Sequence, residues 1–412
     1  MRIPIVIATA MLVAATLLPL WRHPHWFVRG MDFPRMQLAA VASLLILIQV
    51  ISFDLAKTQT WALISITLVC LAWQLWWVLP YTVLWRSEVK TTKTPNPDRK
   101  FSILTANILT PNRQADAFLK LVSQYAPDVL VTLESDQWWQ RHLDTLQVDM
   151  PYSMKCPLDN LYGMHVYSRL PLENTEISYL VEDDIPSMHA QVKLRSGDPV
   201  RMHFLHPAPP SPTENPESAE RDAELVIVAR SMVDRDQPVV VTGDLNDVAW
   251  SATTRLFRKL SGLLDPRVGR GMFNTFHAKY PFVRWPLDHL FHSHHFTVTS
   301  IKRLPYFGSD HFALLTELSY SPVRGKDQEG LMAEADDNSW ALSIAEEQDA
   351  SAKDVPNPKE MGSDLGCLKT RFLALFFCSV FEPAEIGPKA YSVGLFNDQK
   401  EGQKWSKPKW NF

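Results

Sequence analysis

Residues able to carry out acid–base or metal chemistry recur in short clusters between positions 105 and 311. Most clusters follow an apolar, β-prone run, and a side chain just past a buried strand is held rigidly at the rim of a sheet. One such cluster is a weak signal, but six favour a site for metal-assisted hydrolysis of phosphate esters. In chain order they are Thr105-Ala106-Asn107, Leu133-Glu134, His206-Pro207, Gly243-Asp244-Leu245-Asn246, Asp288-His289 and Ser309-Asp310-His311.

This chemistry needs three kinds of group. A divalent cation neutralises charge on the phosphate and the leaving oxygen, a base deprotonates water, and donors stabilise the transition state. Mg²⁺ prefers one or two carboxylates with several waters, and Glu134, at the end of an apolar run, suits that role. Asp310 offers a second carboxylate beside His311. Taken alone, each is more often a solvated or structural feature, so the conjunction of clusters carries the prediction.

The remaining clusters supply acid–base groups and donors. Asp244 can accept a proton from water, and Asn246, two residues on, can face the same pocket and donate to a phosphate oxygen. His206 precedes a proline, which fixes the chain, and its imidazole can donate to the phosphate. Asp288 can orient a histidine, as in other histidine–carboxylate pairs.

The first 90 or so residues are of a different kind, with three apolar runs that carry almost no charge: Ile3–Leu20, Leu38–Phe53 and Trp61–Leu84. A membrane span needs about 20 apolar residues, and Trp and Tyr residues cluster near the ends of the runs, as they do at membrane interfaces. The alternative is a signal peptide followed by buried helices, but no convincing cleavage site follows the first run. The sequence therefore predicts a multi-pass membrane anchor.

Basic residues predict the orientation of this anchor. With three spans, the loop after the first and the segment after the third share one side, which carries Arg22, Arg29, Arg35, Arg86, Lys90 and Lys93. The other side carries only Arg2 and Lys57. The positive-inside rule therefore places the large C-terminal part in the cytoplasm.

Composition divides the chain into an anchor at 1–86, a polar linker at 87–100, a catalytic domain at 101–320 and an acidic tail at 321–412. In the catalytic domain, strand-length apolar runs mix with helical periodicity, which indicates a mixed pair of sheets with helices outside. Predicted strands are Phe101–Ala106, Asp128–Leu133, Gly163–Ser168, Val200–Leu205, Val239–Thr242 and His311–Leu318; predicted helices are one capped by Asn112 and one at Glu217–Val233.

The tail and the cysteines carry little signal. Lys326–Gly362 is acidic and poor in aromatics, so we expect disorder. The apolar stretch Phe372–Phe381 is too short to span a bilayer as a helix, and we assign the tail no function. The cysteines lack disulfide or zinc spacing and are expected to be free thiols; they are Cys70, Cys156, Cys367 and Cys378.

With these motifs in this order, residues 101–320 resemble the endonuclease/exonuclease/phosphatase superfamily, whose fold is similar to that of deoxyribonuclease I. The resemblance covers about half of the chain, and the membrane-anchored N-terminus is similar to a bacterial subgroup. It implies a four-layer α/β sandwich, preceded here by three transmembrane helices, with the active site at one end of two packed sheets. It also implies Mg²⁺ or Mn²⁺ as cofactor, with Glu134 as the main ligand and Asn107 and Asp310 nearby.

The resemblance also implies roles for the catalytic residues. Asp244 is similar to a water-orienting carboxylate and Asn246 to a phosphate-binding amide. His311 resembles the family histidine that pairs with a carboxylate, here Asp288, and acts either as base or as phosphate ligand. His206 matches a second histidine that stabilises the phosphate or the leaving group.

The chain departs from the family pattern just before the paired histidine. Many members carry Arg-Ile-Asp where this chain has Pro286-Leu287-Asp288, with Arg284 displaced, so a role borrowed from that arginine is in doubt. The nearby histidines at 292, 294 and 295 match no family role, and we interpret them as a solvated strand end.

The substrate is the least determined property. The net charge of −4 is mild, yet 251–288 holds seven basic residues against two acidic ones, which could grip a nucleic acid or an anionic membrane or form a solvated helix face. Trp250, Phe273 and Phe276 could stack a base or belong to the core. We predict a membrane-anchored phosphodiesterase or endonuclease; the alternatives are a phospholipid-directed phosphodiesterase or phosphatase and an inactive scaffold. No protein partner is predicted.

Overall fold

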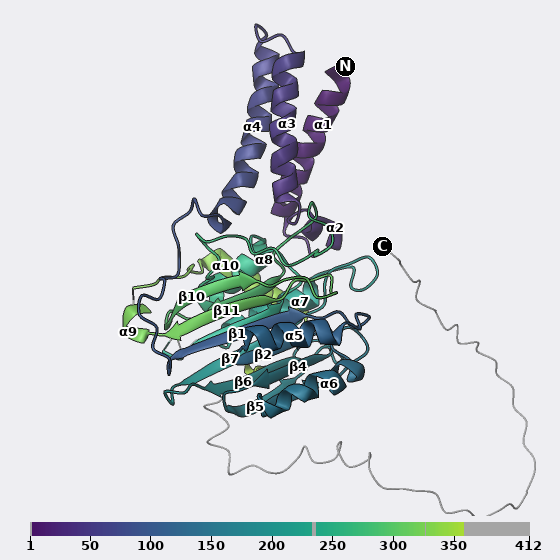
Figure 1. Ribbon diagram of the computed structural model, residues 1–412. Coiled ribbons are helices and arrows are strands. Elements are labelled where there is room, and N and C mark those ends of the chain that lie inside the picture. Colours follow the sequence, from purple (N-terminus) through teal and green to yellow (C-terminus); the bar gives the residue numbers. More distant parts are fainter. Residues whose placement is uncertain (1, 233–235, 326, 358–412) are drawn as a thin grey trace, which may run out of the picture. The chain divides into compact units, whose positions relative to one another are not determined.

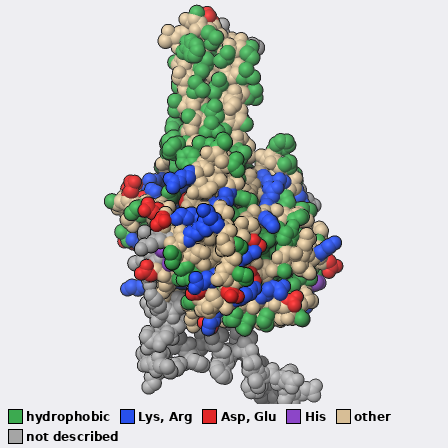
Figure 2. All heavy atoms as spheres, turned by 60° about the vertical axis from the view of Figure 1, so that its left-hand side comes forward, with side chains coloured by type: hydrophobic (Ala, Val, Ile, Leu, Met, Phe, Trp, Pro, Cys, Tyr) green, Lys and Arg blue, Asp and Glu red, His purple; other side chains and the backbone are tan. Residues whose placement is uncertain are grey.

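The computed structural model describes residues 2–232, 236–325 and 327–357 (Figure 1). Three N-terminal segments, Ile3–Trp21, Arg35–Ser52 and Thr58–Tyr81, are helical, with mean hydropathies of 2.3, 1.7 and 1.9. They correspond to helices α1 (Arg2–Leu17), α3 (Arg35–Ser52) and α4 (Thr58–Val78). Hydrophobic side chains dominate the outer surface of this helical segment (Figure 2). The helices are long and apolar enough to cross a membrane, which supports membrane association.

Polar side chains inside the apolar segment tie the three helices together. The Gln49 amide donates to the hydroxyls of Thr9 and Thr67, both at 2.9 Å, and thereby links α3 to α1 and α4. The Gln74 amide donates to the Thr16 hydroxyl at 3.0 Å. Buried polar groups at helix interfaces find partners on neighbouring helices when lipid surrounds them. The three helices therefore form a specific bundle.

The chain after the apolar helices contains two mixed sheets packed face to face. The first has the order β10 (Phe296–Arg303), β11 (Leu314–Tyr320), β1 (Lys100–Asn107), β2 (Val129–Leu133), β4 (Met164–Ser168) and β3 (Tyr152–Cys156). The second has the order β5 (Leu172–Ser178), β6 (Ser187–Lys193), β7 (Pro199–Leu205), β8 (Val239–Asp244) and β9 (Asp288–His292).

Helices cover the outer faces of both sheets and complete four layers. In β1, Phe101 and Ile103 pack into the core between the sheets, whereas Leu104 and Ala106 pack outward. This alternation follows from the two-residue period of a strand, and burial on both faces explains the nearly continuous apolar sequence. The first sheet is covered by α5 (Ala115–Tyr125) and α6 (Gln137–Leu143), and the second by α7 (Ala219–Arg230), α8 (Ala252–Ser261) and α10 (Ala335–Glu347). The predicted α/β sandwich is confirmed.

Two local predictions were wrong. Helix α5 begins after Gln114, while Asn112 lies in the preceding loop and accepts a hydrogen bond from the Gln114 backbone N–H. Part of the acidic segment expected to be disordered forms α10, whose residues Ala341, Ile344 and Ala345 are buried in the cluster that contains α7 and α8. Packing against a distant surface can order a segment whose local composition is polar.

The segment predicted as a linker packs along the domain. The Glu88 carboxylate accepts two hydrogen bonds from Arg258, and Val89 is buried in the inter-sheet core. The Thr92 backbone N–H donates to the Val298 carbonyl at the edge strand β10. Residues 88–92 are thus part of the folded unit. Cys70 and Cys156 are free thiols, whereas Cys367, Cys378 and Phe372–Phe381 lie outside the described residues.

The histidines expected at a solvated strand end are largely internal. His292 is fully buried at the end of β9, and His295 is 6% exposed. The apolar neighbours Leu264 and Phe296 enclose this end of the sheet, so a histidine here is a core residue. Burial lowers the pKa of His292 to about 4, and it also lowers the pKa of His189, on β6, to about 3.

These buried histidines predict acid sensitivity. Their pKa values in the folded chain lie below the unfolded value near 6.5, so the unfolded chain binds more protons below that pH. The contribution of these histidines to the free energy of unfolding is therefore complete above about pH 6.5. As pH drops below this value, the free energy of unfolding falls by up to about 1.4 kcal/mol per pH unit for each such histidine. In denaturant titrations between pH 7 and pH 5, the free energy of unfolding should fall less steeply with pH in His292→Gln than in the wild type. An unchanged slope in that variant would contradict this origin.

Candidate active site

Strand pairing brings the predicted clusters to one rim of the sandwich. β1 runs parallel to β2, with Asn107 opposite Leu133, and β7 runs parallel to β8, with Leu205 opposite Gly243. Asp244 pairs with the first residue of β9, Asp288. A 2.7 Å hydrogen bond between the hydroxyls of Thr105 and Thr242 holds the two sheets together just behind this rim. The residues at or just past these strand ends therefore share one edge: Asn107, Glu134, His206, Asp244, Asn246 and Asp288.

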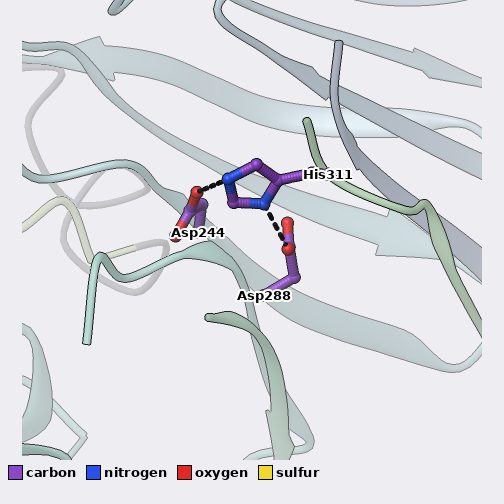
Figure 3. A group of neighbouring side chains, drawn as sticks. All are labelled: Asp244, Asp288 and His311. Atoms are coloured by element: carbon purple, nitrogen blue, oxygen red, sulfur yellow. Dashed lines mark hydrogen bonds and ion pairs between the residues drawn. The ribbon is translucent and has the colours of Figure 1, made fainter. Parts of the chain in front are cut away.

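His311 lies between two buried carboxylates (Figure 3). Its Nδ1 is 2.8 Å from Oδ2 of Asp288, and its Nε2 is 3.5 Å from Oδ2 of Asp244. Burial alone would lower the pKa of His311, but the charges of Asp288 and Asp244 outweigh burial and raise the pKa to about 10. The two carboxylates thus favour the protonated form of His311, which is a donor at both ring nitrogens.

Glu134 has one carboxylate oxygen that accepts no hydrogen bond from the described residues. It follows β2 in a left-handed backbone conformation with φ of 56°, and its Oε1 accepts a 2.6 Å hydrogen bond from the Asn107 amide. Its Oε2 is buried without a hydrogen-bond partner among the described residues. Burial, and then the charge of Asp310, raise the pKa of Glu134 to about 8. A buried oxygen beside another carboxylate fits a divalent cation, which would offset both charges.

Asn107 connects the two halves of the site. Its amide nitrogen contacts Glu134 and also lies 3.3 Å from Oδ2 of Asp244. Its amide oxygen accepts the backbone N–H of Leu109 at 3.1 Å. In this arrangement Asn107 orients the Glu134 carboxylate, and the second lone pair of its amide oxygen is available to a cation.

Asp244 and Asn246 lie in one tight turn. Oδ1 of Asp244 accepts the backbone N–H of Asn246 at 3.0 Å, and Asn246 adopts φ of 51°. The Asn246 amide donates one hydrogen to the Pro207 carbonyl at 2.9 Å, which leaves its second hydrogen for a ligand. Burial raises the pKa of Asp244, although His311 opposes the shift.

His206 is a neutral imidazole at the same rim. It is 2% exposed, and its Nδ1 is buried without a hydrogen-bond partner among the described residues. Burial lowers the pKa of His206 to about 4, against the attraction of Asp244. The ring of Tyr162 lies 5.4 Å from it. An unpartnered nitrogen in this position is available to a ligand.

Two further residues support the site: Ser309, to which no role of its own was assigned from the sequence, and Phe276, which was predicted only as a base-stacking or core residue. The Ser309 hydroxyl donates to the Asn107 carbonyl at 2.8 Å and accepts the His311 backbone N–H at 3.0 Å. The Phe276 ring lies 4.9 Å from the His311 ring. The only indication of Ser309 in the sequence was its position next to Asp310. Phe276 reaches His311 from a separate loop, which sequence spacing does not reveal.

Several basic residues of the stretch 251–288 have partners within the folded chain. Arg258 is 2% exposed and pairs with Glu88, and Arg267 is 1% exposed and pairs with Asp265. Arg284 donates to the carbonyls of His277 and Ala278 and so braces its own loop. Trp250 is a core residue whose indole N–H donates to the Asp32 carbonyl, so it cannot stack a base. The interpretation of this stretch as a solvated helix face or a surface grip is wrong for the two buried arginines.

The sequence model of the endonuclease/exonuclease/phosphatase family matches residues 104–311, half of the chain. The chain belongs to this family. Its members are hydrolases of phosphate esters, and every candidate residue above falls inside the matched range. No curated protein sequence matches this chain significantly.

Solved structures of similar fold cover about half of the chain. TDP2 of D. rerio, complexed with a single-strand DNA product, shares 19% identity over 54% of this chain and 100% of its own, with a TM-score of 0.45. The human Nocturnin catalytic domain, with bound sulfate, shares 17% identity over 55% of this chain and 96% of its own, with a TM-score of 0.44. An endonuclease/exonuclease/phosphatase from Beutenbergia cavernae shares 18% identity over 54% of this chain and 72% of its own, with a TM-score of 0.45. The family assignment rests on the sequence match.

Proposed function

We propose that this chain is a divalent-metal-dependent phosphodiesterase of the endonuclease type, held at a membrane by its N-terminal helices. One observation carries the proposal: a continuous chain of contacts runs along the rim from Glu134 through Asn107, Asp244 and His311 to Asp288. It joins a candidate metal ligand to acid–base groups within one buried site. Such a chain is also the main argument against the inactive scaffold.

Glu134, Asn107 and Asp310 are the proposed metal ligands, and Asn107 also orients Glu134. Their hard oxygen donors favour Mg²⁺ or Mn²⁺. Such an ion, when bound, neutralises charge on the phosphate and on the leaving oxygen. The unmatched buried oxygen of Glu134 and its raised pKa support this assignment.

Asp244 is the proposed base for the attacking water. Its raised pKa makes it a better proton acceptor than an ordinary carboxylate. The water oxygen forms a bond to phosphorus as the ester P–O bond breaks, and the water proton passes to Asp244. The charged His311, fixed by Asp288, donates to the phosphate oxygen that gains charge, which favours the phosphate-ligand role over the base role. Asn246 and His206 are proposed to bind the phosphate.

For localisation, we propose that the chain crosses a membrane three times with its catalytic part in the cytoplasm. The three apolar helices and the excess of basic residues at the catalytic end support this orientation. Protease accessibility of residues 54–57, the loop between α3 and α4, in intact cells against inverted vesicles tests the orientation.

A second substrate class, phospholipid, is favoured by the loop between Phe276 and Trp285. Phe276 contacts the catalytic His311, and the Ala278 N–H donates to the Asp310 carbonyl at 2.6 Å. At the other end, the Phe282 carbonyl accepts a hydrogen bond from Gln37, in the first turn of α3. The Phe282 side chain is 87% exposed. One loop thus connects the site with the start of a candidate membrane span.

We expect Phe282→Asp to separate the two substrate classes. If the substrate is a phospholipid, turnover on phosphatidylinositol or sphingomyelin vesicles should fall about tenfold, because an apolar contact with the bilayer is replaced by a charge. Turnover of a soluble chromogenic bis-phosphodiester should be unchanged. Val148→Asp, which places the same charge at another exposed apolar position, is the matched control. Cleavage of plasmid DNA but of no lipid by the wild type would exclude the phospholipid candidate.

A further inference from the structure

Six charged side chains are buried together between the membrane-proximal segment and the catalytic turn. Three come from α2 (Trp26–Gly30), the turn after it and the first residue of α3; two come from α7, and one follows the Asp244–Asn246 turn. Each is at most 6% exposed. The set contains three positive and three negative groups, so its charges balance: Arg29, Asp32, Arg35, Arg221, Asp222 and Asp247.

A continuous path leads through this cluster from the membrane side to the site. Arg29 Nη2 is 3.0 Å from Oδ2 of Asp222. The other oxygen of Asp222 accepts two hydrogen bonds from Arg221, at 3.1 and 2.8 Å. Arg221 Nη1 then donates to the backbone carbonyl of Asn246 at 2.8 Å. Three side chains therefore connect α2 with the turn that carries the proposed base.

The path ends at the backbone of Asn246. Asn246 adopts a left-handed conformation, which is uncommon for a residue other than glycine. The Asn246 backbone N–H donates to the Asp244 carboxylate, and the Asn246 side-chain amide donates to the Pro207 carbonyl. The position of the Asn246 carbonyl therefore affects how the Asp244 carboxylate and the Asn246 amide are oriented. Asp247, the next residue, lies 3.4 Å from Arg221 and accepts hydrogen bonds from Ser251 and Thr253. Arg221 thus holds both residues at the end of the turn.

Further hydrogen bonds join α2 and its flanking residues to the chain before α7 and after the Asp244–Asn246 turn. The Trp250 indole N–H donates to the Asp32 carbonyl at 2.8 Å, and the Trp26 N–H donates to the Pro216 carbonyl at 2.9 Å, just before α7. Ser218, next to α7, donates its N–H to the Pro24 carbonyl at 2.9 Å. The chain on both sides of the Arg29–Asp222 pair is therefore fixed.

We propose that Arg29 and Asp222 are positioning residues for catalysis, so that the membrane-proximal helix α2 forms part of the scaffold of the active site. This inference rests on the proposed catalytic role of the Asp244–Asn246 turn. Without Arg29, Asp222 keeps the Ser218 hydroxyl but only Arg221 as a positively charged partner, so we expect Arg221 to be drawn away from the Asn246 carbonyl. A fragment that begins after α4 lacks Arg29, Asp32 and Arg35 and should be poorly active.

The test compares variants of the full-length chain in detergent micelles on a soluble chromogenic bis-phosphodiester. We expect Arg29→Ala to lower kcat about 10- to 100-fold with KM nearly unchanged, because a shift of about 1 Å in a catalytic group has effects of this size. Arg29→Lys, which keeps the charge, should recover most of the activity. Arg22→Ala is the matched control, since Arg22 lies in the same segment but forms an exposed pair with Asp336.

Dependence on Arg221 separates positioning from mere stabilisation. Arg29→Ala should reduce kcat no further in an Arg221→Ala background, because both changes break one path. An independent, multiplicative loss would overturn the inference, as would wild-type kcat in an Arg29→Ala protein with a lowered melting temperature. If Arg29→Ala does not fold, Asp222→Asn, which keeps the side-chain shape, should show the same loss of kcat. Full activity of Asp244→Asn would instead reject the proposed function itself.

Discussion

Replacing Asp244 with asparagine is expected to reduce kcat by about 10²- to 10⁴-fold, the usual contribution of a positioned acid–base group. Asparagine retains an oxygen that can accept the Asn246 N–H, so the turn should keep its shape. What it loses is the capacity to take a proton from water and the negative charge beside His311. Steady-state kinetics on a chromogenic bis-phosphodiester with saturating Mg²⁺ measures the effect.

Two comparisons make the Asp244 result specific. Asp183→Asn, the same change at an exposed aspartate, should leave kcat unchanged. His311→Ala should show a loss of similar order, because the imidazolium and Asp244 act on one phosphate. Near wild-type activity in either Asp244→Asn or His311→Ala would mean that the catalytic site has been assigned to the wrong residues.

Glu134→Gln is expected to weaken Mg²⁺ binding by at least about tenfold and to make turnover depend on high Mg²⁺ concentration. Glutamine fits the same space and can still accept the Asn107 amide, but it provides no negative charge for the ion. Titration of turnover against MgCl₂, together with calorimetric Mg²⁺ binding, measures the shift.

Glu224→Gln provides the matched control for Glu134. Glu224, on α7, is also buried, and burial also raises its pKa to about 8. It stands outside the rim, so its replacement should not change the Mg²⁺ titration. Equal Mg²⁺ dependence in Glu134→Gln and the wild type would remove Glu134 from the metal site.

Strand-end position explains why the sequence could predict residues that the structure brings together. Most candidate residues stand just past an apolar run, and runs such as 129–133 became strands buried on both faces. The strand fixes the position of a side chain at its end, so the sequence pattern predicts which side chains lie at the rim of the sheets. The distances could not be predicted in this way. The contact of Asn107 with both Glu134 and Asp244 depends on how the two sheets pack.

Long-range partners account for the errors. Arg258 belongs to a run of basic residues that suggested a charged surface, but it is buried against Glu88, 170 positions away. The acidic helix α10 is ordered because Ala341 and Ile344 meet apolar residues of α7 and α8. Local composition carries no information about such partners, whereas it did suffice for the three apolar helices, whose length and hydropathy are local properties.

Turnover of a chromogenic bis-phosphodiester by the full-length chain, measured with Mg²⁺ and then with excess EDTA, tests the proposed metal-dependent hydrolysis most directly. We predict turnover that EDTA abolishes, that Mg²⁺ restores, and that is lowered by at least about 10²-fold in Asp244→Asn at every Mg²⁺ concentration. Turnover that persists in EDTA, or that stays near the wild-type rate in Asp244→Asn, would contradict the proposed mechanism.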